Sequence, residues 1–124
     1  AVLVRVPLLM LPPTRGIDAA AVGVKIAAVR IPFSATHVKK LALRSQITAI
    51  TTGATVRVGI YNVTAGAYVI YRDYTAAGEN EDAITTGFPA SGNVLELRVE
   101  CIVAAVGGTA DLNYLLAYVE YGAS

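Results

Sequence analysis

The stretch VLELRVECIVA, residues 94–104, decides the fold class because apolar and polar side chains alternate along it. The apolar residues occupy every second position: Leu95, Leu97, Val99, Cys101 and Val103. The charged residues stand between them: Glu96, Arg98 and Glu100. A period of two places the two sets on opposite faces of a β-strand. The stretch is therefore predicted to be a strand with one face in the core and the other in solvent.

Strand patterns rich in β-branched and aromatic residues recur along the chain, at residues 21–31, 39–47, 54–63 and 67–75. Turn-forming clusters of Gly, Pro, Asn and Asp separate them, at residues 51–54, 64–67, 76–82, 88–93 and 106–111. These patterns predict an all-β protein, an antiparallel β-sandwich of about seven or eight strands with jelly-roll or related Greek-key topology. We expect a single sandwich domain over residues 17–124, preceded by an extended N-terminal arm, residues 1–16.

The C-terminal stretch DLNYLLAYVEYGAS, residues 111–124, is apolar on both faces of its predicted strand. One face carries Leu115, Ala117 and Val119. The other face carries Tyr114, Leu116 and Tyr118. If the first face lies in the core, something else has to cover the second. Because tyrosine combines apolar area with a polar tip and is enriched at interfaces, we expect a neighbouring subunit there.

The N-terminal stretch VLVRVPLLML, residues 2–11, raises the same question, and it ends at Pro12-Pro13. Free apolar edge strands are aggregation hazards, and a proline pair makes a stiff linker. We therefore predict that residues 1–16 form an arm, or an exchanged strand, that adds to a neighbour's sheet. The predicted subunit interface combines both ends of the chain: Val2, Val4, Val6, Leu8, Leu9, Tyr114, Leu116, Tyr118 and Tyr121.

The composition favours an assembled protein. Charged residues make up 15% of the chain, against a typical ~25%, and hydrophobic residues make up 55%. Much of the surface of so small a domain must then be apolar or neutral, and contiguous exposed apolar patches usually mark interaction surfaces. The net charge of +1 offers no electrostatic footprint for nucleic acid. The longest charge-free run, residues 58–71, is too short for a spanning helix, so no membrane span is predicted.

Few residues suit metal binding or nucleophilic catalysis. The single cysteine, Cys101, lies on an apolar strand face, and the single histidine is His37. No disulfide within the chain and no Cys/His zinc site can form from this pair. The acidic cluster at residues 79–82 lacks the ligand spacing of a calcium loop and is expected in a solvated turn.

Two carboxylates and one sequon remain. Glu96 and Glu100 flank Arg98 on one strand face, an arrangement typical of a cross-strand ion-pair ladder rather than of a glycosidase pair. Asn62 begins the glycosylation sequon NVT, which also suits an ordinary turn. We predict a protein that is not an enzyme and that binds no cofactor.

The overall pattern resembles the single jelly-roll cement or decoration proteins of tailed bacteriophages. The resemblance rests on size and on strands in series, such as LALRSQI, TVRVGIYNVTAGAYVIY and GNVLELRVE, and it covers residues 36–121. It implies a trimer or dimer that sits on the virion, contacts a second structural protein such as a major capsid protein, and stabilises the shell without enzymatic activity.

Three alternatives stay open at this point. The first is a subunit of an extracellular, pilus-like filament, in which Val2, Val4 and Val6 lie on a donor strand that fills a groove in the next subunit. The second is a carbohydrate-binding module, which would present its tyrosines in a groove and stay monomeric. The third is an enzyme with a perturbed carboxylate near Glu96 or Glu100.

Overall fold

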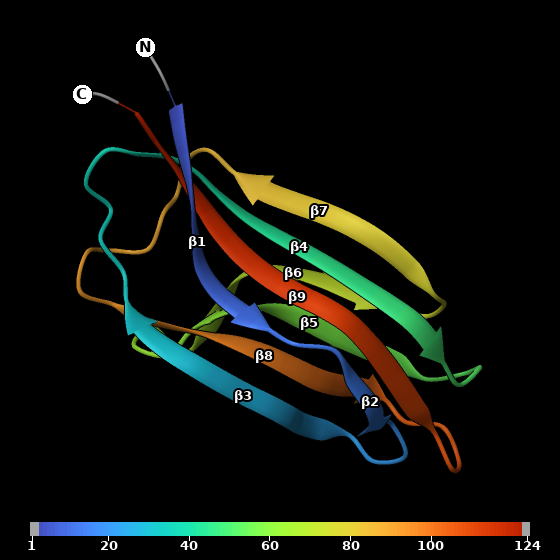
Figure 1. Cartoon of the computed structure of the whole chain (residues 1–124). Helices are drawn as coiled ribbons and strands as arrows, with labels where there is room; N and C mark the ends of the chain where they lie inside the picture. Colours follow the sequence, from blue (N-terminus) through green and yellow to red (C-terminus); the bar gives the residue numbers. More distant parts are fainter. Residues whose placement is uncertain (1–2, 123–124) are drawn as a thin grey trace.

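The computed structural model describes residues 3–122, which form an antiparallel β-sandwich of nine strands (Figure 1). The strands are β1 (Leu3–Leu11), β2 (Thr14–Asp18), β3 (Gly23–Pro32), β4 (Val38–Ile50), β5 (Thr55–Asn62), β6 (Ala67–Tyr74), β7 (Gly78–Ile84), β8 (Val94–Val103) and β9 (Thr109–Gly122). This confirms the predicted all-β sandwich. The described residues include no helix long and apolar enough to cross a membrane.

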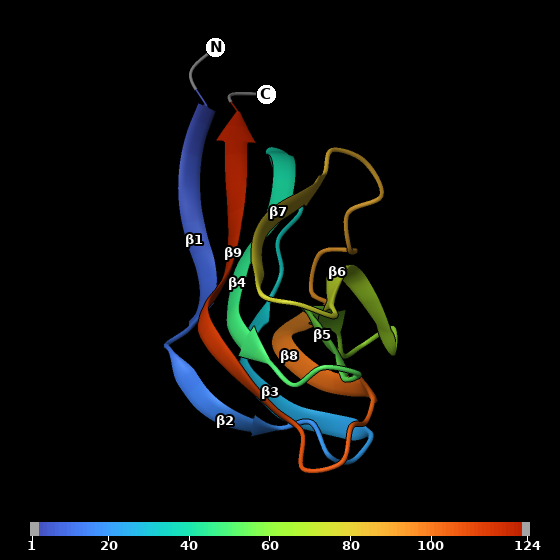
Figure 2. The same ribbon diagram turned by 90° about the vertical axis from the view of Figure 1, so that its right-hand side faces the viewer.

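The order of the strands is that of a jelly roll. The first sheet runs β1-β9-β4-β7, with β2 also paired to β9, and the second sheet runs β3-β8-β5-β6. The antiparallel pairs are nested: β5 with β6, β4 with β7, β3 with β8, and β1 and β2 with β9. The chain is thus one long hairpin folded over into two sheets, which Figure 2 shows from the side.

The core lies between the two sheets and follows the predicted alternation. On β8, Leu95, Leu97, Val99 and Cys101 are all completely buried. Leu41 and Leu43 of β4 oppose them from the first sheet and are equally buried. Val103, the last apolar residue of the β8 pattern, is 47% exposed because the strand ends there.

The strand count exceeds the prediction at two places. Residues 78–84, the first five of which belong to a predicted turn cluster, form the edge strand β7. The N-terminal stretch forms two strands, because Pro12 and Pro13 have no N–H to donate and interrupt the ladder along β9. Strand β2 crosses the boundary expected between arm and domain at residues 16 and 17.

The N-terminal segment is part of the sandwich over its described residues. Leu9 and Leu11 are 2% and 7% exposed and belong to the core of the same chain. Towards the chain ends, β1 and β9 project past the second sheet (Figure 2). Val4 and Val6 lie on the inner side of the first sheet, as do their ladder partners on β9. Because the second sheet does not cover them there, they remain 54% and 36% exposed.

Candidate functional site: an apolar flank with an open strand edge

One flank of the sandwich collects the exposed apolar side chains. Strands β1 and β3 are the edges of the two sheets on this side, and they contact each other. Seven of the ten large apolar side chains that are exposed within residues 3–122 lie on these strands or just before β3. They define the apolar flank: Leu3, Val4, Val6, Met10, Val22, Val24 and Val29.

The opposite flank, formed by β6 and β7, carries charges instead. Arg72 of β6 makes a two-pronged ion pair with Asp82 of β7, with distances of 2.6 and 3.1 Å. Glu79 and Glu81 are exposed on the same edge strand. Charged side chains on an edge strand discourage another chain from adding to the sheet. The two flanks therefore differ in what they offer to a partner.

The edge strands β1 and β3 of the apolar flank differ in their regularity as well. Strand β3 has two register shifts, and Val29 beside the second one has a φ of 60°, which is rare for a β-branched residue. Strand β1 has one shift, between Pro7 and Leu9. Before that shift, residues Leu3–Pro7 pair one for one with β9. We call Leu3–Pro7 the open edge segment, because it is regular, apolar except for Arg5, and free along its outer side in the described chain.

The predicted interface residues from the N-terminus divide between surface and core. Val4 and Val6 lie on the apolar flank. Leu8 is partly buried, and Leu9 is buried in the chain's own core, so Leu9 has almost no surface to offer to a partner. Val2 lies outside the described residues.

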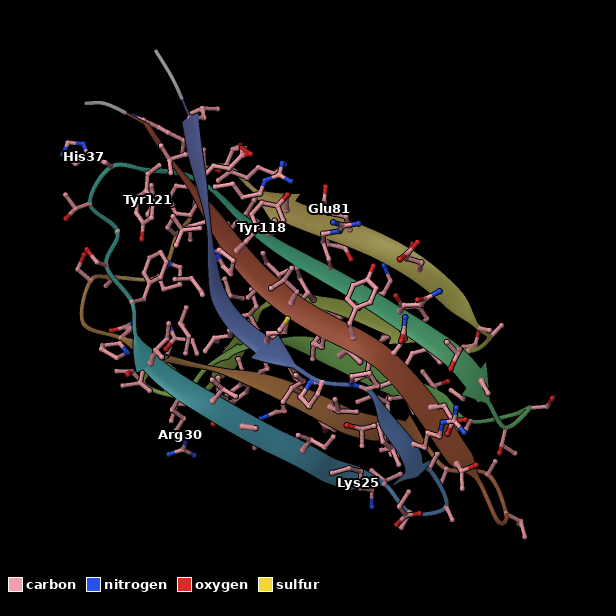
Figure 3. All side chains as sticks on the ribbon, in the orientation of Figure 1. Lys25, Arg30, His37, Glu81, Tyr118 and Tyr121 are labelled. Atoms are coloured by element: carbon pink, nitrogen blue, oxygen red, sulfur yellow. The ribbon has the colours of Figure 1, made fainter. Side chains whose placement is uncertain are left out.

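Tyr118 is covered by side chains of its own chain. It is 1% exposed, and its hydroxyl donates a hydrogen bond of 2.9 Å to Glu81 on β7 (Figure 3). To reach β7 from β9 the ring crosses β4, where the residue facing it in the ladder is Ala42. The Arg5 guanidinium lies 4.4 Å from the ring centroid. The sequence pattern predicts a neighbouring subunit over this second face of β9. At Tyr118, however, the face is covered by side chains of the same chain.

The other C-terminal residues predicted for the interface are spread over both sides of the first sheet. Tyr114 lies on the outer face and donates a hydrogen bond of 2.5 Å to Glu79, while Leu116 beside it is half-buried. Burial, and then this hydrogen bond, raise the pKa of Tyr114. Tyr121 lies on the inner side and packs against the core. The structure thus places Tyr121 beside its ladder partner Val4 on the inner side, and Tyr114 and Tyr118 on the opposite face of the sheet.

A polar hollow of about 200 Å³ opens beside Tyr114 on the outer face of the first sheet. Its lining comes from three neighbouring strands: Arg44, Glu79, Asn80, Glu81 and Tyr114. Arg44 and Glu81 face each other across 3.6 Å, and both side chains are more than 40% exposed. The sequence did not point to this hollow, because the three strands that form it become neighbours only in the fold.

The carboxylates considered for catalysis are engaged in pairs on the outer face of the second sheet. Glu96 is completely buried between the guanidinium groups of Arg30 and Arg98, at 2.8 and 2.9 Å. Glu100 accepts a hydrogen bond of 2.7 Å from Tyr68. Glu96 therefore makes the expected cross-strand ion pair, with Arg30 of β3 as a partner that the sequence pattern did not identify, whereas Glu100 pairs with a tyrosine.

The remaining candidate residues take structural positions. Cys101 is buried, and its thiol donates to the carbonyl of Val103 at 3.4 Å. His37 is exposed in the turn before β4, with a φ of 61°. Asn62 is 6% exposed, and its side chain accepts from the Ala65 amide within the turn. Among residues 3–122, no group of three or more His, Cys, Asp or Glu side chains is placed to hold a metal ion.

Comparison with known proteins identifies no relatives. No protein-family model matches the chain, and no curated protein matches it in sequence. Among solved structures, dimeric latent PorU from Porphyromonas gingivalis aligns with a TM-score of 0.44 and 8% identity, over 89% of this chain but 12% of PorU. CBM1 of BiXyn10A, in its apo form, aligns with a TM-score of 0.42 and 10% identity over 97% of both chains. Similarity at this level assigns neither a family nor a function.

Proposed function

We propose that this protein is a structural assembly subunit, without enzymatic activity, that associates with further copies through the apolar flank and decorates a virion. The observation that carries the proposal is the contrast between the two flanks. Exposed apolar side chains gather on β1 and β3, whereas the β6–β7 flank carries charged side chains and ion pairs. Contiguous apolar patches on a soluble surface usually mark an interaction site.

The apolar flank is large enough to supply much of the apolar area of a subunit interface. Its side chains are 36–64% exposed. The seven of them leave on the order of 500 Å² open, and a standard interface takes about 800 Å² from each partner, somewhat more than half of it apolar. The jelly-roll topology is compatible with the virion role, because viral capsid domains, like lectin domains, use this architecture.

The filament alternative requires β1 to leave its own sheet. Strand β1 occupies its own place in the sheet, with Leu9 and Leu11 in the core. Exchange of β1 with a neighbour would first withdraw both side chains, at about 1.5–3 kcal/mol for each buried leucine. A closed oligomer in which every subunit keeps its β1 avoids this cost.

Mass in solution, measured by light scattering after size exclusion, tests the proposal. We expect an oligomer for the unmodified chain and a shift towards monomer for the double variant Val4→Lys with Val24→Lys, which places two charges on the apolar flank. The matched control is Val106→Lys, a fully exposed valine in the β8–β9 connection, which should leave the oligomer intact. A monomer throughout would refute assembly through this flank. A monomer that also bound saccharides at the polar hollow would favour the carbohydrate-binding alternative.

A further inference from the structure

The free side of the open edge segment has a definite pattern of backbone donors and acceptors. Pro7 pairs with Tyr118 in the β1–β9 ladder but has no N–H to donate. A proline in an edge strand is tolerated where its nitrogen faces away from the sheet. Residues Leu3–Pro7 pair without a register shift, so the N–H and C=O groups of Leu3 and Arg5 face the same free side. Those of Val4 and Val6 face β9.

We propose that the open edge segments of two copies pair antiparallel about a two-fold axis at Val4, joining the first sheets of both molecules into one continuous sheet. The inference rests on the proposed function and specifies its partner as a second copy of this chain. In this register Leu3 of each copy faces Arg5 of the other. Each such pair exchanges two backbone hydrogen bonds, and Val4 faces Val4 between them.

The neighbouring registers are less favourable for identifiable reasons. An axis at Arg5 places two guanidinium groups opposite each other, and like charges in that position are destabilising. It also places Pro7, which has no donor, opposite Leu3. An axis at Val6 places Pro7 opposite Arg5, so that half of the donors needed there are missing. The axis at Val4 keeps Pro7 out of the hydrogen-bonded pairs formed by Leu3 and Arg5.

The other edges of the molecule suit β1 less well than a second β1 does. The β6 and β7 edges carry the ion pair of Arg72 with Asp82 and the exposed Glu79 and Glu81. The β3 edge is interrupted by two register shifts. An isologous contact instead places apolar flank against apolar flank. Arg5 keeps its ion pair with Glu120 on its own β9, at 3.2 Å, on the outer face of the joined sheet.

Disulfide trapping tests the register. In a non-hydrogen-bonded antiparallel pair the Cα atoms are about 4.5 Å apart, within the range of about 4.4–6.8 Å that a disulfide spans. We expect the Val4→Cys variant to form a covalent dimer on mild oxidation, seen on a non-reducing gel and by mass spectrometry. In the matched control, Val6→Cys, the two thiols would lie four residues apart along the strands, about 13 Å, and should not join. The unmodified chain, whose Cys101 is buried, gives the background.

A second variant separates the backbone contact from a general effect on the fold. Leu3→Pro, made together with Val4→Cys, removes a donor from the free side and leaves the pairing of Val4 and Val6 with β9 intact. We expect it to reduce the covalent dimer at least several-fold while circular dichroism stays unchanged.

The outcomes distinguish this inference from the proposed function. Equal or stronger trapping of Val6→Cys would show that the register is wrong. No trapping of either variant, in a chain that light scattering shows to be oligomeric, would refute the β1 pairing and leave the assembly proposal standing. No trapping together with a monomeric mass would refute both.

Discussion

Gly59 shows how a single residue shapes the outer face of the second sheet. A Cβ added at this position would come within 2.7 Å of the Ile70 carbonyl oxygen and 2.8 Å of a Tyr68 ring carbon. The Tyr68 ring thus lies where any larger residue at position 59 would need space. We expect Gly59→Ala to lower the free energy of unfolding by about 1–3 kcal/mol, as overpacking does, measured by urea denaturation.

Gly78→Ala is the matched control for this substitution. The nearest atom to a Cβ at Gly78 is a Tyr74 ring carbon at 3.6 Å, an ordinary contact. Replacing a glycine where the backbone tolerates alanine usually changes stability by less than about 1 kcal/mol, and often favourably. Equal losses for the two variants would show that the Tyr68 ring does not occupy the space above Gly59.

Tyr68 also gives the fold a dependence on alkaline pH. Burial, and then the hydrogen bond to Glu100, raise the pKa of Tyr68 above its ordinary value of 10.0. The neutral phenol is therefore favoured in the folded state, and its contribution to stability is complete below pH 10. As the pH rises above 10, the unfolded chain ionises first and the folded state loses stability.

Urea midpoints at pH 8 and pH 11 test this dependence. We expect the midpoint of the unmodified chain to fall more over this interval than that of Tyr68→Phe. The control is Tyr71→Phe, which changes a ring of the same cluster, 5.6 Å from that of Tyr68, without touching Glu100. The same fall in all three proteins would assign the alkaline sensitivity to other groups.

At the scale of the element, substitutions in β1 test whether the N-terminal segment is a strand of the sandwich or a detachable arm. Leu9 is 2% exposed and its neighbour Met10 is 63% exposed. We expect Leu9→Ala to cost about 2–5 kcal/mol of unfolding free energy, as for other buried leucines. Met10→Ala should stay within about 0.5 kcal/mol. If both substitutions are neutral in urea denaturation, β1 does not hold its place in the core in solution.

Some of the strands could be predicted from the sequence and others could not. Strand β8 could be predicted, because one face is apolar and the other charged along most of its length. Strand β7, GENEDAI, could not, because this edge strand is mostly polar and charged and has no apolar period. The sequence of β1 indicates an arm because the strand is mostly apolar and carries few of the charges that usually protect an exposed edge strand. Its pairing with β9 depends on contacts between opposite ends of the chain.

At the scale of the whole molecule, the sandwich could be predicted but the candidate site only in part. Periodicity identifies faces, and Val4 and Val6 do lie on the apolar flank. Periodicity does not give strand order, so the sequence could not show that β1 and β3 share a flank. It also could not show that Tyr118 crosses Ala42 to reach Glu81. This contact depends on the order β9-β4-β7 in the sheet, because a side chain of β9 reaches across β4 to β7.

The nested pairing has a consequence for how the protein is made. The β5–β6 hairpin joins residues close in sequence, whereas the outermost pair joins Leu3 to Gly122. Closing the longest loop has the largest entropic cost, so we expect the strands to form from the innermost pair outward. Of the nine described strands, β1 and β2 are synthesised before the others but pair only with β9, which is synthesised after the others. While the strands between them are being synthesised, β1 and β2 are therefore the ones that wait longest for their partner.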